Sequence, residues 1–253
     1  MKKILILMVG CLFALGLFGC SQGQKTNYID DQAMSIIANG FEKRSDYVTN
    51  SSMDSAKEYK GAVQTEIDAD AELKTAQFED SKMQEVVISY LNSLDDQLKV
   101  IEGNQYGSAD FYKEWSKAYD KRTSIVKTLV DDYGLTVGDK YKEAFDQLVA
   151  NGSSVVEKNT QKEAIQTLFT NAEWEKTSTG GSYYQYTTVI ENTTNYNFKG
   201  VSATVSLYDA DGVKTESSVY ANTWSKGEKA KFSLTSQTDA ERVVATISYY
   251  NVA

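Results

Sequence analysis

The side chains that could do chemistry in this chain are carboxylates, because the 253-residue sequence contains no histidine. That absence excludes Ser-His-Asp and Cys-His catalysis and histidine-ligated zinc. Asp68, Asp70 and Glu72 form the densest acidic run, but at a spacing of two they do not all share one helical face. We therefore interpret them as solvated acidic surface. The alternative is a glycan- or cell-wall-modifying hydrolase, whose two carboxylates would face each other about 5–9.5 Å apart across a cleft.

A second acidic motif, Asp209-Ala-Asp211-Gly212, could begin a calcium loop. Such a loop needs six or more oxygen ligands and a glutamate at its twelfth position, which here is Tyr220. Asp-Gly between two alternating segments is also a strong hairpin signal. The motif is therefore predicted to be a turn, and we predict neither a metal site nor a cofactor.

Tyrosines are the most promising candidates for recognition. Tyr183, Tyr184 and Tyr186 lie on one expected strand, and Tyr249 and Tyr250 lie on the last. Tyrosine is common in binding surfaces because it offers a large contact area at a low entropic cost. It is also a good strand residue, so core and cross-strand packing is the favoured interpretation. The alternative is a recognition patch for a glycan or a protein.

The first 19 residues form a targeting signal. Lys2 and Lys3 precede an uncharged, mostly apolar run at residues 4–18, which is shorter than the roughly 20 residues of a spanning helix. The ending Leu17-Phe18-Gly19-Cys20 resembles a bacterial lipobox. That resemblance implies cleavage before Cys20, thioether lipidation of its sulfur and attachment to the membrane. The alternative is an ordinary signal peptide with an incidental cysteine.

The net charge and the length of the tether indicate where the folded part of the protein would lie relative to the membrane. Losing Lys2 and Lys3 with the signal would lower the net charge from −9 by two, to −11. An acidic exterior argues against nucleic acid and against anionic headgroups, so the two acyl chains would have to hold the protein. Residues 20–28 are a short polar tether. We expect a lipid-anchored protein on the outer side of the cell membrane, or in the periplasm if the host is Gram-negative.

Residues 29–172 are expected to form an up-and-down helical bundle, because apolar residues recur there every three or four positions. Asp30 or Asp31 should cap the first helix. Ser81-x-x-Gln84 looks like a capping box, and Ser108 and Gly134 should bound the next long helix. Asn151-Gly152 should break or bend the last stretch, beyond which Val155, Val156, Ile165, Leu168 and Phe169 form a final apolar stripe. Core packing is the favoured role of these stripes, and an exposed partner-binding groove is the alternative.

From residue 173 the apolar period changes from 3.6 to 2, which predicts six strands in residues 173–253. Strands every 10–15 residues without intervening helices indicate an antiparallel sandwich. The predicted fold class is therefore α+β with two domains, a helical bundle followed by a β-sandwich.

One resemblance refines the second domain. Gly200-Val201, then Val205-Ser-Leu207-Tyr208-Asp209, then Gly227-Glu228-Lys229-x-x-Phe232 resemble the FxLYD module of bacterial, mostly Gram-positive, envelope lipoproteins. The likeness covers roughly the last 70 residues, with Val205 in place of the phenylalanine. It implies an immunoglobulin-like sandwich displayed at the surface, and no reaction.

The function expected from the sequence is non-catalytic binding or scaffolding at the cell envelope, with an unidentified envelope protein or glycan as partner. The carboxylate-based hydrolase is the main alternative. A third possibility is a receptor for a soluble ligand, which would need an apolar pocket of about 300 Å³ or more.

Overall fold

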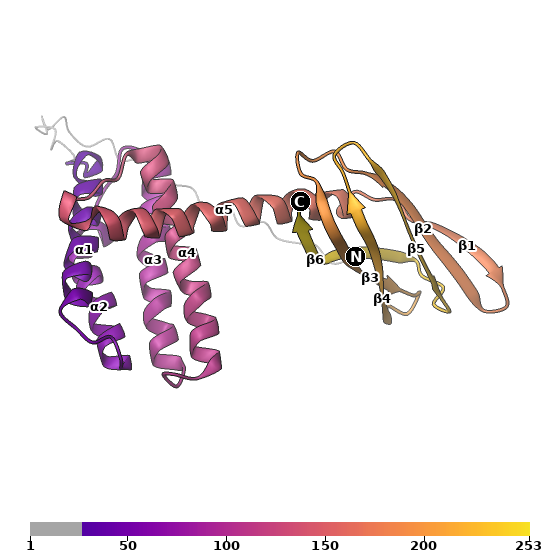
Figure 1. Ribbon diagram of the computed structural model, residues 1–253, viewed down its shortest axis with the longest axis horizontal. Helices are drawn as coiled ribbons and strands as arrows, with labels where there is room; N and C mark the ends of the chain where they lie inside the picture. Colours follow the sequence, from indigo (N-terminus) through magenta and orange to yellow (C-terminus); the bar gives the residue numbers. More distant parts are fainter. Residues whose placement is uncertain (1–26) are drawn as a thin grey trace, which may run out of the picture.

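The chain combines helices with antiparallel sheets, so the predicted α+β class is confirmed (Figure 1). The computed structural model describes residues 27–253, and the predicted signal, Cys20 and most of the tether lie outside them. The helices are α1 (Asp30–Thr49), α2 (Ala56–Ala69), α3 (Ser81–Gly103), α4 (Ala109–Tyr133) and α5 (Lys142–Thr170), with 3-10 turns η1 (Ala71–Lys74) and η2 (Asp139–Tyr141). The strands are β1 (Glu175–Gly180), β2 (Tyr183–Glu191), β3 (Phe198–Tyr208), β4 (Lys214–Trp224), β5 (Lys229–Ser236) and β6 (Arg242–Val252).

Helix ends follow local hydrogen-bond chemistry, with two corrections to the predicted caps. Ser108 caps α4 by accepting from the Phe111 N–H, and Gly134 ends it in the left-handed conformation, as predicted. The cap of α3 is Asp80 rather than Ser81, because the longer carboxylate reaches two N–H groups of the first turn. Asp30 does not cap its own helix. Its carboxylate accepts from the backbone N–H groups of residues 79 and 80 and so joins the starts of α1 and α3.

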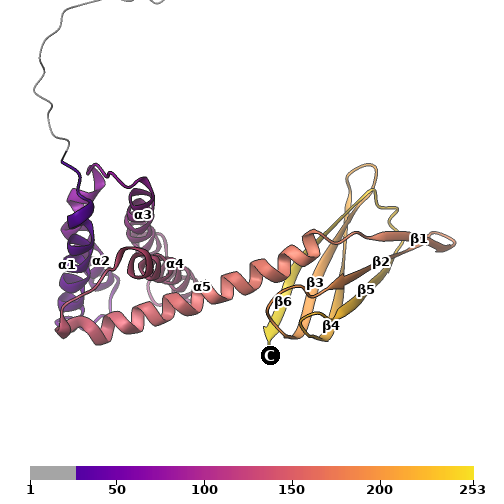
Figure 2. The same cartoon turned by 90° about the horizontal axis from the view of Figure 1, so that it is seen from above.

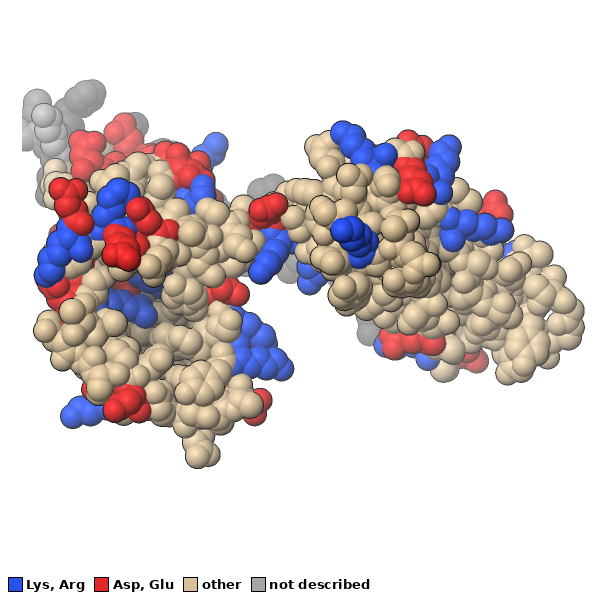
Figure 3. All heavy atoms as spheres, in the orientation of Figure 1, with Lys and Arg blue, Asp and Glu red and all other residues tan. Residues whose placement is uncertain are grey.

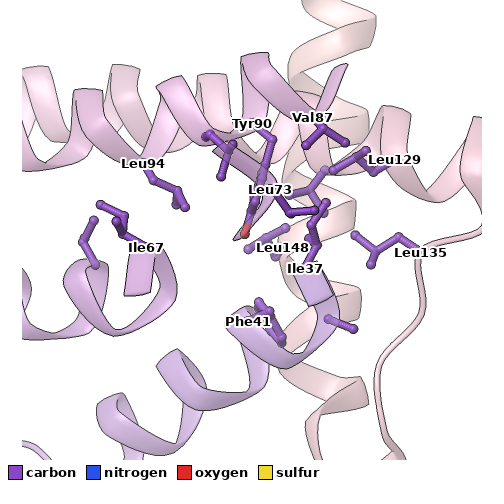
Figure 4. Packing of buried hydrophobic residues seen from close by; sticks show 14 of the residues in the cluster. Ile37, Phe41, Ile67, Leu73, Val87, Tyr90, Leu94, Leu129, Leu135 and Leu148 are labelled. Atoms are coloured by element: carbon purple, nitrogen blue, oxygen red, sulfur yellow. The ribbon is translucent and has the colours of Figure 1, made fainter. Parts of the chain in front are cut away.

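Helices α1 to α4 run up and down beside one another, but α5 lies across them (Figures 1 and 2). The expected bundle of parallel and antiparallel helices is therefore wrong for α5. The four upright helices and the start of α5 bury one apolar cluster, which Figure 4 shows around Ile37, Leu73 and Leu129. Among the helices of residues 27–253, none is both long enough and apolar enough to span a membrane.

The predicted break at Asn151-Gly152 does not occur, because these residues make a helix crossing instead. A Cβ atom at residue 152 would lie well inside 3.0 Å of the Thr123 carbonyl oxygen, so only glycine lets α5 pass so close to α4. The Asn151 side chain donates to the Thr123 hydroxyl at 2.8 Å and to the Asp120 carboxylate at 3.1 Å. Helix α5 therefore continues without interruption for 29 residues.

The six strands form two three-stranded antiparallel sheets, β1-β2-β5 and β4-β3-β6. Alternate residues of both sheets enter one apolar core, including Tyr186, Phe232, Val205 and Trp224. Ile165 and Phe169 of α5 are buried in this second core and not in the first. Between the two cores, residues 156–160 of α5 are exposed. Val156, expected on the apolar stripe, belongs to this exposed stretch.

Gly152→Ala tests the close crossing. The new methyl group would collide with backbone, which cannot move aside as a flexible side chain can, so we expect the free energy of unfolding to fall by about 1–3 kcal/mol. Gly103→Ala is the matched control. It lies in the last turn of α3 with open space around its Cβ position, so it should stabilise by about 0.5–1 kcal/mol. Urea denaturation measures both, and equal stabilisation by the two alanines would contradict the crossing geometry.

Candidate functional site

The tyrosines predicted to bind are divided between the two sheets. Tyr183 is 48% exposed at the start of β2, near the tip of the β1–β2 hairpin, where residues 177–190 contain no charged side chain and Figure 3 shows an uncharged surface. Tyr184 is half-buried and donates to Asp239 at 3.1 Å. Tyr186 is buried; its hydroxyl donates to the Thr238 carbonyl at 2.6 Å and accepts from the Ala240 N–H at 2.8 Å. Tyr186 is therefore a core residue that fixes the connection between β5 and β6.

The two C-terminal tyrosines lie on β6, in the other sheet. Tyr250 is half-buried, and its hydroxyl donates to the Lys158 carbonyl of α5 at 2.8 Å. Tyr249 points outward and is 56% exposed. The structure thus does not gather the five predicted tyrosines into one patch, because their strands belong to sheets on opposite sides of the core.

Tyr249 instead has a partner that the sequence analysis missed. Tyr220 of β4 is 57% exposed, and both tyrosines pair with Ser202 of the central strand β3. The β3–β4 hairpin register could have been counted outward from Asp211-Gly212, which places Tyr220 opposite Ser202. The β3–β6 pairing joins residues 34 to 54 positions apart and contains register shifts, so no local signal could have placed Tyr249 there.

A second cluster of reactive side chains lies inside the helices. Glu66 of α2 is fully buried, and its carboxylate accepts from Arg44 at 2.7 Å, from Tyr90 at 2.6 Å and, through a short contact, from Arg122. Asp70 lies one turn further along, with its Oδ2 3.0 Å from the Tyr90 hydroxyl oxygen. Figure 4 shows the Tyr90 oxygen among apolar side chains of the same core.

The two carboxyl groups differ in charge state because only one has cations. Burial alone would raise the pKa of Glu66, but Arg122 and Arg44 overcome this and hold it at about 2. Asp70 has no ion-pair partner among the described residues, and burial together with the nearby Glu66 carboxylate raises its pKa to about 8. Burial also raises the pKa of the Tyr90 hydroxyl, which therefore keeps its proton.

These pKa values fix the direction of the hydrogen bonds. Tyr90 has a single proton, which it donates to the Glu66 carboxylate, so its oxygen is free to accept from a protonated Asp70. Gly40 of α1 makes room for this carboxyl, since a Cβ there would overlap both oxygens of Asp70. The interpretation of Asp70 as solvated surface is therefore wrong, whereas Asp68 and Glu72 are exposed as expected.

The sequence contained a partial signal for this cluster. Glu66 and Asp70 are four residues apart, and Glu66 falls between the apolar positions Val63 and Ile67 that mark the buried face of α2. Arg44 and Arg122 lie 22 residues before and 56 residues after Glu66, so their convergence depends on tertiary packing. Chemically, the arrangement is a hydrogen-bonded network in which the Glu66 carboxylate lies between two guanidinium groups while Asp70 is neutral, so the cluster carries one net positive charge. Both carboxyls are buried, so a substrate cannot contact them in this conformation.

Hollows on the surface bear on the receptor alternative. A groove of about 620 Å³ lies between the end of α5 and β2, where Leu168 and Val189 share the lining with three glutamates, Glu173, Glu175 and Glu191. A smaller hollow of about 360 Å³ lies beside the turn before α5 and is lined by Leu135, Phe145 and other side chains. The first is wide enough for a small ligand, but its carboxylates make it unlike an apolar pocket.

The predicted hairpin turn at Asp209-Gly212 is confirmed. Asp209 accepts from the backbone N–H groups of Asp211 and Val213, which uses its carboxylate to close the turn. Within residues 27–253, no group of three or more histidine, cysteine, aspartate or glutamate side chains is placed to hold a metal ion.

Comparison with known proteins does not identify a family. No protein-family model and no curated protein sequence matches the chain. One similar solved structure is the Pseudomonas fluorescens alkylpurine DNA glycosylase AlkC bound to DNA containing an abasic site analogue. It is 11% identical, covers 87% of this chain and 75% of that one, and has a TM-score of 0.22. That similarity is too low to carry an argument, and the FxLYD resemblance stays a prediction.

Asp70→Asn should change how stability depends on pH. Between about pH 4 and pH 8 the folded protein holds a proton on Asp70 that the unfolded chain has lost, so stability falls as pH rises, by about 1.4 kcal/mol per unit. Asparagine removes this contribution and can donate to Tyr90. We expect the variant to gain stability over the wild type as pH rises, levelling off near pH 8. Urea denaturation from pH 5 to 8 measures the free energy of unfolding of each protein. The control Asp68→Asn changes an exposed residue and should leave the dependence of stability on pH as in the wild type. If the curves of stability against pH for Asp70→Asn and the wild type were parallel, Asp70 would not be the buried, protonated group.

Glu66→Gln should destabilise the helices strongly. Removing the carboxylate leaves the buried Arg122 and the largely buried Arg44 without a counter-charge, which costs about 3–5 kcal/mol. Glu102→Gln removes an exposed ion pair with Lys60 and should cost at most about 1 kcal/mol. Thermal or urea unfolding compares the two, and a cost for Glu66→Gln as small as that of the control would disprove the network.

Proposed function

We propose that this protein is a lipid-anchored lipoprotein of the bacterial cell envelope that binds or scaffolds without catalysing a reaction. The observation that carries the proposal is the unbroken helix α5, which joins the helical part to the sheets. At about 1.5 Å per residue its 29 residues extend about 43 Å. Figure 2 shows the sheets at the other end of α5 from α1, which is the first helix after the proposed tether.

Both ends of α5 are fixed, which makes it a spacer rather than a flexible linker. Phe145 and Leu148 are buried in the helical core, and Ile165 and Phe169 in the sheet core. Gln166 adds two hydrogen bonds to β6: its amide donates to the Ala245 carbonyl at 3.0 Å and its oxygen accepts from the Ile247 N–H at 2.8 Å. Such a spacer suits a protein that presents one part at a set distance from a surface.

The finer fold assignment belongs to the same proposal. Two separate apolar cores support a division into a helical domain at residues 29–172 and a sheet domain at residues 173–253. Two facing three-stranded antiparallel sheets support an immunoglobulin-like, FxLYD-type sandwich. In this proposal the body faces the outside of a Gram-positive cell, or the periplasm of a Gram-negative one.

The proposal excludes catalysis and nucleic-acid binding. Glu66 and Asp70 are buried and hydrogen-bonded to Tyr90, so this carboxyl pair does not favour the hydrolase alternative. The net charge is −9, and positive and negative side chains are interspersed on the face that Figure 3 draws. A phosphate backbone would find no continuous basic surface on that face.

Cys20→Ser tests the anchor. Without the thiol there is no acceptor for the diacylglyceryl group, so metabolic labelling with a radioactive fatty acid should be lost and the protein should leave the membrane fraction. Cys11→Ser removes the other cysteine, which lies within the proposed signal, and should keep its label. Undiminished labelling of the Cys20→Ser protein would refute the proposal.

A further inference from the structure

The outer face of the β4-β3-β6 sheet carries two exposed tyrosines around a glycine. Tyr220 on β4 and Tyr249 on β6 flank β3, and each pairs with Ser202. Neighbouring strands lie about 4.8 Å apart, so the two backbones are roughly 10 Å apart. More than half of each side chain remains exposed.

Gly200 determines how these rings lie. Its φ of +68° is a conformation that favours glycine, and it falls where the β3–β6 register shifts. A Cβ built on Gly200 would be 3.3 Å from the Tyr220 hydroxyl oxygen and 3.3 Å from Cε1 of Tyr249. Both rings therefore lean inward over β3 and do not stand upright on the sheet. A leaning ring presents one of its faces to solvent.

Beside the rings, the sheet offers hydroxyl groups and no charge. The next row pairs Ser218, Thr204 and Thr246 across the three strands. Ser248 adds another hydroxyl, which donates to the Ser202 carbonyl at 3.1 Å and contacts its Oγ at 3.2 Å. Charged residues begin only at the ends of this region, with exposed Lys199 at one end and the Lys214–Glu216 pair at the other.

We propose that this face, Tyr220–Gly200–Tyr249 with its adjoining hydroxyl row, binds a neutral glycan chain. The C–H faces of pyranose rings are apolar and can stack on exposed aromatic faces, while serine and threonine hydroxyls exchange hydrogen bonds with sugar hydroxyls. The hydroxyl row contains no charged side chain, so an uncharged ligand could cover it without burying a charge that lacks a counter-ion. The proposal deepens the envelope-binding function proposed above and rests on it.

Other occupants fit this face less well. An anionic polymer would need a cluster of cations, and residues 198–206, 216–224 and 244–252 of the three strands contain one cation, Lys199. An extended peptide that adds a strand needs an open sheet edge, and Gln166 already contacts the edge of β6. A peptide added at the other edge, beside β4, would lie three strands away from Tyr249 and would not use both tyrosines. The tyrosines could also serve only to cover Gly200. That purely structural role predicts a loss of stability on truncation with no effect on any ligand.

Isothermal titration calorimetry tests the proposal. The full-length protein, in detergent, is titrated with two neutral probes, cellohexaose and chitohexaose. Tyr220→Ala and Tyr249→Ala should each weaken binding about three- to tenfold, and the double variant more. Tyr220→Phe and Tyr249→Phe keep the ring and should bind within about twofold of the wild type. Tyr183→Ala, which changes a comparably exposed tyrosine on the other sheet, should bind normally.

Each outcome is decisive once circular dichroism shows that the variants are folded. The proposal is supported if either neutral hexaose binds the wild type and the phenylalanine variants of Tyr220 and Tyr249 but loses affinity for the alanine variants. Absence of binding to both neutral probes, an equal loss in Tyr183→Ala, or tighter binding of an oligogalacturonate hexamer would overturn it. Fatty-acid labelling of Cys20 is read separately, so a failure of the glycan site leaves the anchored function standing.

Discussion

Helix α5 is the constraint on which the arrangement of this protein depends. It contributes Phe145 and Leu148 to one apolar core and Ile165 and Phe169 to another, with an exposed stretch between them. Across residues 156–160 the connection rests on helical hydrogen bonds and on the hydrogen bond from the Tyr250 hydroxyl to the Lys158 carbonyl. Both ends of α5 are packed into a core. A rotation of the helical part must therefore either move the sheets with it or bend the exposed turns of α5 at residues 156–160.

The helical core is organised by charge as well as by apolar packing. Glu66 compensates two arginines from two other helices, and Tyr90 links it to a neutral Asp70. Replacing a buried ion pair by apolar residues of similar volume is often neutral or stabilising, so the role we assign to this network is to fix how the helices pack rather than to add stability. It requires α1, α2, α3 and α4 to meet in one register, since Arg44, Glu66, Tyr90 and Arg122 come from four different helices.

Patterns within a single element were predictable, and contacts between elements were not. The six strands, the Asp209-Gly212 turn and the Ser108 and Gly134 helix ends follow from local chemistry that the sequence displays directly. Gly152 was misread because the same residue that weakens an isolated helix also permits close helix packing, and only the position of Thr123 decides between them. The Tyr220–Tyr249 pair and the Glu66 network needed a strand pairing and a helix packing that no periodicity encodes.

The hydrogen bonds from Gln166 to β6 have a consequence for self-association. A terminal strand normally leaves alternate amide and carbonyl groups available to any passing chain, which is how swapped dimers and fibrils begin. Here one side-chain amide satisfies the Ala245 carbonyl and the Ile247 N–H from the helix that precedes the sheet. The Gln166 side chain thereby hinders a second chain from pairing with this part of the C-terminal strand, and it does so without proline.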